Sequence, residues 1–262
     1  MPQGKRGERE LDFGMYVSGL QSHAGSLFCV FLASFLQSIT GFGLVMVAAP
    51  LLMFFYEPKF TIIIMFCLAG CGNCVQLLLL WKQVNWQRIA ELFCGALAGI
   101  PLGVAVFRQL PGGGLRAAIS IAVLLTLVTM EFRRRRFEET RKNTILTGML
   151  AGIMAMTTGM AGPPLILYFA YTSMPQNVFR ATCIGYFFFS NLGSLIALWV
   201  TGVPIGEAVG ECLFLLPGLA CGIALGHWAF AFMPQQLIRK IIIILLYATC
   251  LYNICKAFQL FS

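Results

Sequence analysis

The chain has 262 residues, of which 59% are hydrophobic and only 11% are charged. Soluble domains carry about twice that share of charged residues. Several charge-free runs also exceed the roughly 20 residues that cross a bilayer core as a helix. The composition therefore excludes an ordinary soluble domain and predicts an all-α polytopic membrane protein.

The formal net charge of +8 does not indicate a nucleic-acid partner, because six of the eighteen Lys and Arg residues lie within residues 133–142. A basic loop between spans marks the cytoplasmic side and meets anionic lipid. We expect residues 131–143 to form this cytoplasmic loop. Residues 1–26 begin polar and charged, which predicts a polar, interfacial N-terminal segment without a cleavable signal peptide.

Eight apolar runs follow in chain order, at about residues 27–56, 61–81, 89–107, 115–130, 144–171, 181–200, 206–232 and 237–258. The second half repeats the first. The motif Gly99–Gly103 matches Gly222–Gly226, and Asn73 matches Asn191. We interpret the pattern as a duplicated four-segment unit, with repeat 1 over residues 27–130 and repeat 2 over residues 144–262.

The first run of each repeat is interrupted by glycine and proline, at Thr40–Gly43 and at Thr158–Pro164. An unbroken helix of about 30 residues would be about 45 Å long, too long for a core of about 30 Å. Two half-length pieces that enter and return make the number of crossings odd. We therefore expect inverted repeats with broken or re-entrant first segments and about 8 to 10 helices. The loop charges do not discriminate between inverted and parallel repeats.

Broken segments at matching places in two halves point to a transporter's binding site. Half-helix N-termini there would offer backbone N–H groups and partial positive charge to an anion. Polar side chains nearby would add contacts, although Asn73, Gln76, Asn191 and Ser194 are equally typical of bonds between helices. The predicted substrate-binding residues are Gln37, Thr40, Gly41, Phe42, Gly43, Asn73, Gln76, Thr157, Thr158, Gly159, Met160, Gly162, Pro163, Asn191 and Ser194.

Few ionisable residues lie near the membrane, and such residues are functional candidates. Arg180, Glu211 and His227 are candidates for coupling or gating, with Glu211 and His227 expected deeper than Glu91, Arg180 and Glu207. Cys67, Cys71 and Cys74 could form a soft-metal or redox site. Their apolar surroundings favour packing instead, so we predict no metal, no cofactor and no enzyme activity.

Three motifs resemble the TauE/SafE sulfite-exporter family of membrane permeases. They are Thr40-Gly41-Phe42-Gly43 with Pro50, Gly159-Met160-Ala161-Gly162-Pro163-Pro164-Leu165, and Arg180-Ala181. The resemblance extends from about residue 27 to the end of the chain. It implies secondary transport of sulfite or a small organosulfur or sulfonate anion across the plasma (inner) membrane of a bacterium. The Gly-Pro-Pro of the second motif stands where many members carry a glycine run, so the resemblance does not specify the substrate.

The leading hypothesis is therefore an ion-coupled exporter of a small sulfur-containing anion. A passive anion channel and an intramembrane redox protein that uses the cysteines remain as alternatives. The redox protein would need clustered ligands or a nucleophile with a base, and dispersed cysteines supply neither.

Overall fold

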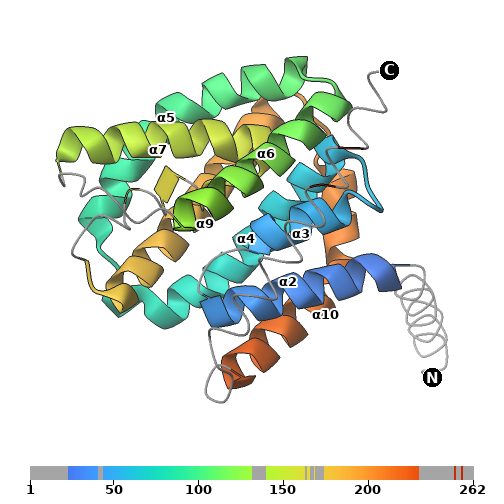
Figure 1. Cartoon of the computed structure of the whole chain (residues 1–262), viewed down its shortest axis with the longest axis horizontal. Helices are drawn as coiled ribbons and strands as arrows, with labels where there is room; N and C mark the ends of the chain where they lie inside the picture. The colour runs from blue at the N-terminus through green and yellow to red at the C-terminus, as the bar shows by residue number, and fades with distance from the viewer. Residues whose placement is uncertain are drawn as a thin grey trace, which may run out of the picture.

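The computed structural model describes residues 23–40, 44–131, 140–162, 164–165, 168, 174–229, 251 and 255. This part of the chain is helical and holds eight long α-helices and one short 3-10 helix, η1 at Trp81–Gln83, with no strand. Figure 1 shows them as one helical bundle. The α-helices are α2 Ala24–Thr40, α3 Leu44–Leu52, α4 Pro58–Leu80, α5 Trp86–Gln109, α6 Gly112–Glu131, α7 Arg141–Thr158, α9 Gln176–Val200 and α10 Gly206–Ala229.

Four of these helices are long and apolar enough to cross a membrane: Pro58–Gln83, Trp86–Gln109, Asn177–Val200 and Gly206–Ala229. Large apolar side chains such as Leu79, Trp199 and Trp228 are exposed on their outer surfaces. Lipid, rather than a protein core, suits such surfaces. The prediction of an all-helical, multi-pass membrane protein is confirmed. The apolar run at residues 237–258, apart from Leu251 and Cys255, lies outside the described residues, as do residues 1–22 and 132–139.

The first apolar run forms a helical hairpin, as its length predicted. Helix α2 ends at Thr40, α3 begins at Leu44, and the two helices pack against each other. The hairpin closes at its far end, where the Tyr56 hydroxyl lies 3.1 Å from Ser26 Oγ. The chain therefore enters along α2 and returns along α3, which makes the first segment re-entrant.

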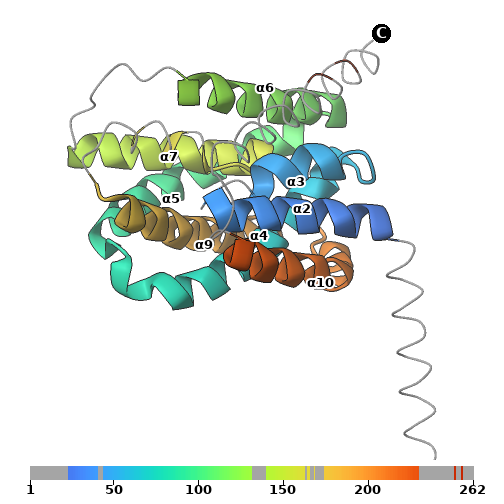
Figure 2. The same ribbon diagram turned by 60° about the horizontal axis from the view of Figure 1, so that its bottom comes forward.

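The two repeats exchange partners. Helix α2 of repeat 1 packs against α10 of repeat 2, and α7 of repeat 2 packs against α5 of repeat 1. Both views show these two pairs side by side (Figures 1 and 2). At the centre, α4 packs against α9. Each first segment is therefore held by the third apolar segment of the other repeat, which is α5 in repeat 1 and α10 in repeat 2.

Glycines spaced four apart make both exchanged contacts possible. On α5, Gly95 and Gly99 lie against the backbone of α7 near Ile145 and Met149. On α10, Gly218, Gly222 and Gly226 lie against the α2 carbonyls of Leu27, Phe31 and Phe35, respectively. Small residues at this spacing let helix backbones approach closely in a membrane.

The contacts also give the direction of each helix. Residue numbers rise together in the α5–α7 contacts and in the α2–α10 contacts, so each pair is parallel. Helix α10 is parallel to α4 as well, because Cys212 lies at Ile64 and Leu219 at Gly72. The chain reverses between α4 and α5. Helix α2 therefore runs opposite to α7, as Figure 2 also shows, and as inverted repeats require.

One boundary differs from the expectation. The apolar runs end at about residue 107 and resume at about residue 115. In the structure, Gly112–Gly114 form the first turn of α6, so only residues 110–111 separate α5 from α6. The internal prolines Pro50, Pro101 and Pro217 likewise lie within continuous helices. Neighbouring helices tolerate such prolines at membrane depth.

Candidate functional site

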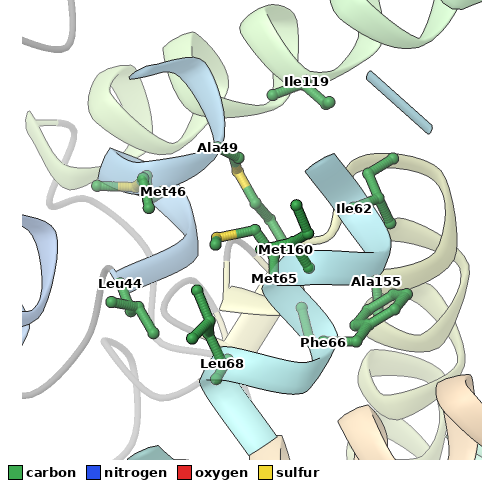
Figure 3. Close-up of a cluster of buried hydrophobic side chains, with 14 of the residues drawn as sticks. Leu44, Met46, Ala49, Ile62, Met65, Phe66, Leu68, Ile119, Ala155 and Met160 are labelled. Atoms are coloured by element: carbon green, nitrogen blue, oxygen red, sulfur yellow. The ribbon is translucent and has the colours of Figure 1, made fainter. Parts of the chain in front are cut away.

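The two breaks lie next to each other between the repeats. Helix α7 ends at Thr158, and Gly159 follows in a left-handed conformation with φ of 74°, its N–H donating to Ala155 O at 2.7 Å. A Cβ on Gly159 would lie 3.3 Å from Val45 Cγ1, in the first turn of α3. Figure 3 shows Met160 among the side chains of α3 and α4. The predicted breaks near residues 40–43 and 158–164 are confirmed as helix ends.

Polar side chains surround the end of α2. The Gln37 amide donates from Nε2 to Asn73 Oδ1 of α4 at 3.4 Å, and both residues are buried. Among the described residues, Gln37 Oε1 and Ser38 Oγ have no hydrogen-bond partner. Two acceptors and one hydroxyl donor are thus available next to the first break.

Arg180 brings a cation to the same place. It lies in the second turn of α9, half-buried, and its Nη2 donates to Ser38 O at 3.4 Å. Its Nε is buried, and no partner for it is found in the described part of the chain. The sequence placed Arg180 near a membrane interface. The structure places its guanidinium at the first break. This adds a cation that neither broken run contains in the sequence.

Further polar atoms without partners lie along α4 and α9. Both amide atoms of Gln76, one turn from Asn73, and Ser194 Oγ are buried and unpaired within the described residues. Asn191 is buried one turn before Ser194. A buried polar atom without a partner costs about 1–3 kcal/mol. Water or a ligand in contact with these groups would remove that cost.

The two threonines of the second break use their hydroxyl groups locally. Thr157 donates to Ile153 O at 3.0 Å, and Thr158 donates to Met154 O at 2.7 Å. Thr158 Oγ1 also accepts from Met160 N at 3.3 Å, which caps the end of α7. A hydroxyl has one hydrogen to donate. In this conformation the two side chains therefore shape the break rather than offer hydrogens to a ligand.

The remaining predicted site residues divide into two groups. Gly159 and Met160 are buried and Gly162 is half-buried beside the breaks. The side chain of Thr40 and residues Gly41, Phe42, Gly43 and Pro163 lie outside the described part of the structure. Their role in binding stays a prediction.

The ionisable candidates lie elsewhere than expected. Glu211 and His227 were expected deep, but Glu211 is in the second turn of α10 and His227 is exposed in its last turn. Glu207 is exposed in the first turn of α10. Glu91 is buried and forms an ion pair with Arg88 at 3.1 Å. Hydropathy locates an apolar run but does not fix its ends, which accounts for the error at both residues.

The cysteines of α4 do not form a cluster with other ligands. Cys67 and Cys74 are half-buried and Cys71 is exposed. No group of three or more His, Cys, Asp or Glu side chains that could hold a metal occurs among the described residues.

The sequence model of the family described as "Sulfite exporter TauE/SafE" matches residues 26–253. No curated protein and no solved structure matches the chain significantly. The matched range covers both breaks, Arg180 and the polar residues of α4 and α9, so the family assignment includes the whole candidate site. The chain belongs to the TauE/SafE family of sulfite exporters, which are membrane transporters rather than enzymes.

Proposed function

We propose that this protein is a secondary transporter that exports sulfite or a small organosulfur or sulfonate anion across the bacterial plasma membrane. The anion binds where the two broken segments meet, between repeat 1 at residues 27–130 and repeat 2 at residues 144–262. Arg180 supplies the positive charge. Free N–H groups at the start of α3 and the polar side chains Gln37, Asn73 and Gln76 supply the remaining contacts.

The observation that carries this proposal is Arg180 beside the first break. Its half-buried guanidinium lies at Ser38, two residues before the end of α2, and its Nε has no partner in the described structure. An unpaired buried charge is costly, whereas a guanidinium matches the oxygens of an oxyanion. The adjacent N-terminus of α3 favours negative charge as well.

The direct test is flux into or out of proteoliposomes that hold the purified protein. We expect radiolabelled sulfite or a sulfonate such as isethionate to move faster than through protein-free liposomes. Movement that saturates with concentration and exchanges labelled for unlabelled anion across the bilayer supports a transporter. Non-saturating flux of chloride and sulfite alike would instead indicate a passive channel, and the absence of anion flux would contradict the proposal.

The orientation of the protein can be tested separately. We predict that residues 131–143 face the cytoplasm, because basic residues near the ends of spans stay inside. In a variant depleted of reactive native cysteines, Asn143→Cys should resist an impermeant thiol reagent added to intact cells. The same reagent should label it after permeabilisation. Labelling in intact cells would reverse the orientation.

A further inference from the structure

In each re-entrant segment, a cluster of polar side chains connects the two ends of the segment, on the side away from the break. The anion site does not include these side chains. The histidine cluster comprises His23, Ser26, Tyr56 and Glu211. The arginine cluster comprises Arg88, Glu91, Thr144 and Tyr168. In both clusters a tyrosine from the returning half meets a hydroxyl residue in the first turn of the entering helix. In both, a charged side chain from the third apolar segment of the other repeat completes the set, Glu211 of α10 in one and Arg88 of α5 in the other.

The histidine cluster joins three parts of the chain. His23 Nε2 lies 2.9 Å from Glu211 Oε1 of α10, and the Tyr56 hydroxyl donates a short hydrogen bond to the same oxygen. Ser26 Oγ donates to His23 O at 2.9 Å. The imidazole ring stacks on Phe214, one turn after Glu211, with ring centroids 5.4 Å apart. Glu211 thus connects the start of α2 with the chain that follows α3.

The arginine cluster has the same plan with a permanent charge. Arg88 Nη1 donates to Thr144 Oγ1 of α7 at 3.0 Å and to Glu91 Oε2 of its own helix at 3.1 Å. Thr144 Oγ1 lies 2.7 Å from the Tyr168 hydroxyl. A guanidinium stays protonated at every pH a protein experiences. This cluster carries an arginine and no histidine, whereas the other cluster carries a histidine.

The two clusters occupy equivalent positions. Arg88 precedes Gly95 by seven residues, and Glu211 precedes Gly218 by seven. Because α2 and α7 run in opposite directions, the clusters lie at opposite ends of the bundle. The arginine cluster is at the end where residues 131–143 join α7, and the histidine cluster is at the other end. Histidine changes charge between about pH 5 and pH 8, so the attachment that can respond to pH lies at one end only.

We propose that His23, Glu211 and Tyr56 form a proton-binding site that couples pH at the end opposite the basic loop to the position of the first hairpin. One proton from water binds the imidazole of His23, and the net charge of the His23–Glu211 pair changes from −1 to 0. The hydrogen bond of 2.9 Å between a neutral imidazole and the Glu211 carboxylate becomes an ion pair between opposite charges, which attract each other more strongly. Protonation therefore strengthens the contact between the start of α2 and α10. It also stabilises the chain after α3, because Tyr56 bonds to the same carboxylate. The proposal rests on the proposed function only in taking this hairpin as part of the transport path.

The other ionisable groups around the cluster do not replace this pair. Glu57 on the loop before α4 and Glu207 on α10 are exposed. Lys59 of α4 points toward the Phe107 ring, 5.7 Å from its centroid. Cys212 turns toward Ile64 O on α4. Burial and the bond to Glu211 raise the pKa of Tyr56, so its hydroxyl stays protonated and remains a donor.

The test combines a structural measurement with a transport measurement. Backbone hydrogen exchange of the peptides covering residues 23–31 and 53–60 is measured on the purified protein at about pH 5.5 and pH 7.5, values that bracket histidine titration. Rates are corrected for the intrinsic effect of pH. We expect at least threefold greater protection at the lower pH in the wild type, and equal protection at both pH values in Glu211→Gln and His23→Gln. Isethionate flux, with a substrate whose own charge does not change in this range, should lose its pH dependence in the same variants.

Two controls separate a proton site from a structural contact. Glu207→Gln removes the same charge one turn earlier on α10, and Glu91→Gln alters the arginine cluster; both should keep the wild-type pH response. A wild type without a pH response, or a response that survives in both Glu211→Gln and His23→Gln, would overturn the proposal. Exchange that depends on pH without any sulfonate flux would support the proton site and contradict the proposed substrate.

Discussion

Replacing Arg180 by glutamine is expected to weaken sulfite binding by about 10- to 100-fold while the protein still folds and inserts. A hydrogen bond to a charged group contributes about 1.5–3 kcal/mol, and each 1.4 kcal/mol is a tenfold change in Kd. Glutamine removes the charge and the fork of donors but keeps a polar side chain next to Ser38 O. The measurement is the dissociation constant for sulfite in detergent, followed by flux in proteoliposomes.

Two control variants show whether binding depends on the guanidinium at position 180 or on any positive charge of the protein. Arg180→Lys keeps a cation but not the planar donors, so we expect an intermediate loss. Arg108→Gln removes an exposed cation from the last turn of α5 and should bind sulfite as the wild type does. Wild-type affinity in Arg180→Gln would place the anion elsewhere, and the buried polar residues Asn191 and Ser194 would then be the next candidates.

The breaks could be predicted from the sequence, but the cation beside them could not. Glycine and proline inside an over-long apolar run are local signals, and the helix ends at Thr40 and Thr158 follow from them. The contact between Arg180 and Ser38 spans 142 residues. No spacing rule along the chain reports such a contact. The sequence marked Arg180 as an arginine near the start of an apolar run and as part of the Arg180-Ala181 motif, but neither signal connects it to Ser38.

The histidine cluster illustrates the same limit. Tyr56 and Glu211 are 155 residues apart in sequence, and His23 precedes the first apolar run. Glu211 was a candidate as an acid in an apolar run, but Tyr56 and His23 gave no functional signal in the sequence. Only the exchange of helices between the repeats, with α10 beside α2, brings them together.

For Thr157 and Thr158, the sequence predicted the position of the break but not how their hydroxyl groups are used. Thr157 and Thr158 do lie at the break, as predicted, but hydroxyls in a helix commonly bond to the carbonyl one turn earlier. Both do so here. The break therefore gains its shape from Thr158 and Gly159, and the polar contacts offered to an anion come from α2, α4 and α9.

The second large effect is expected at the glycines between α5 and α7. Gly95→Ala should destabilise the protein by about 1–3 kcal/mol or prevent it from folding, the usual cost of overpacking a tight contact. The new Cβ would lie 2.7 Å from Met149 N and on top of the Ile145 carbonyl oxygen. Both are backbone atoms of α7, so no side-chain rotation can relieve the overlap and the helices must separate. The measurement is the unfolding midpoint of the purified protein in detergent.

Two other helical glycines provide controls at which alanine is expected to keep or raise the stability of the protein. Around Gly70 on α4 and Gly210 on α10, a Cβ would meet no atom within 4 Å. Alanine in a helix is favoured over glycine by about 0.8–1 kcal/mol, so Gly70→Ala and Gly210→Ala should match or exceed the wild-type midpoint. Gly226→Ala, whose Cβ would lie 2.6 Å from Phe35 O, should behave like Gly95→Ala at the equivalent α2–α10 contact. If Gly95→Ala and Gly226→Ala were as stable as the two controls, the close approach of α5 to α7 and of α10 to α2 would be contradicted. The exchanged packing, which holds the two broken segments next to each other, would then not be the packing of the protein.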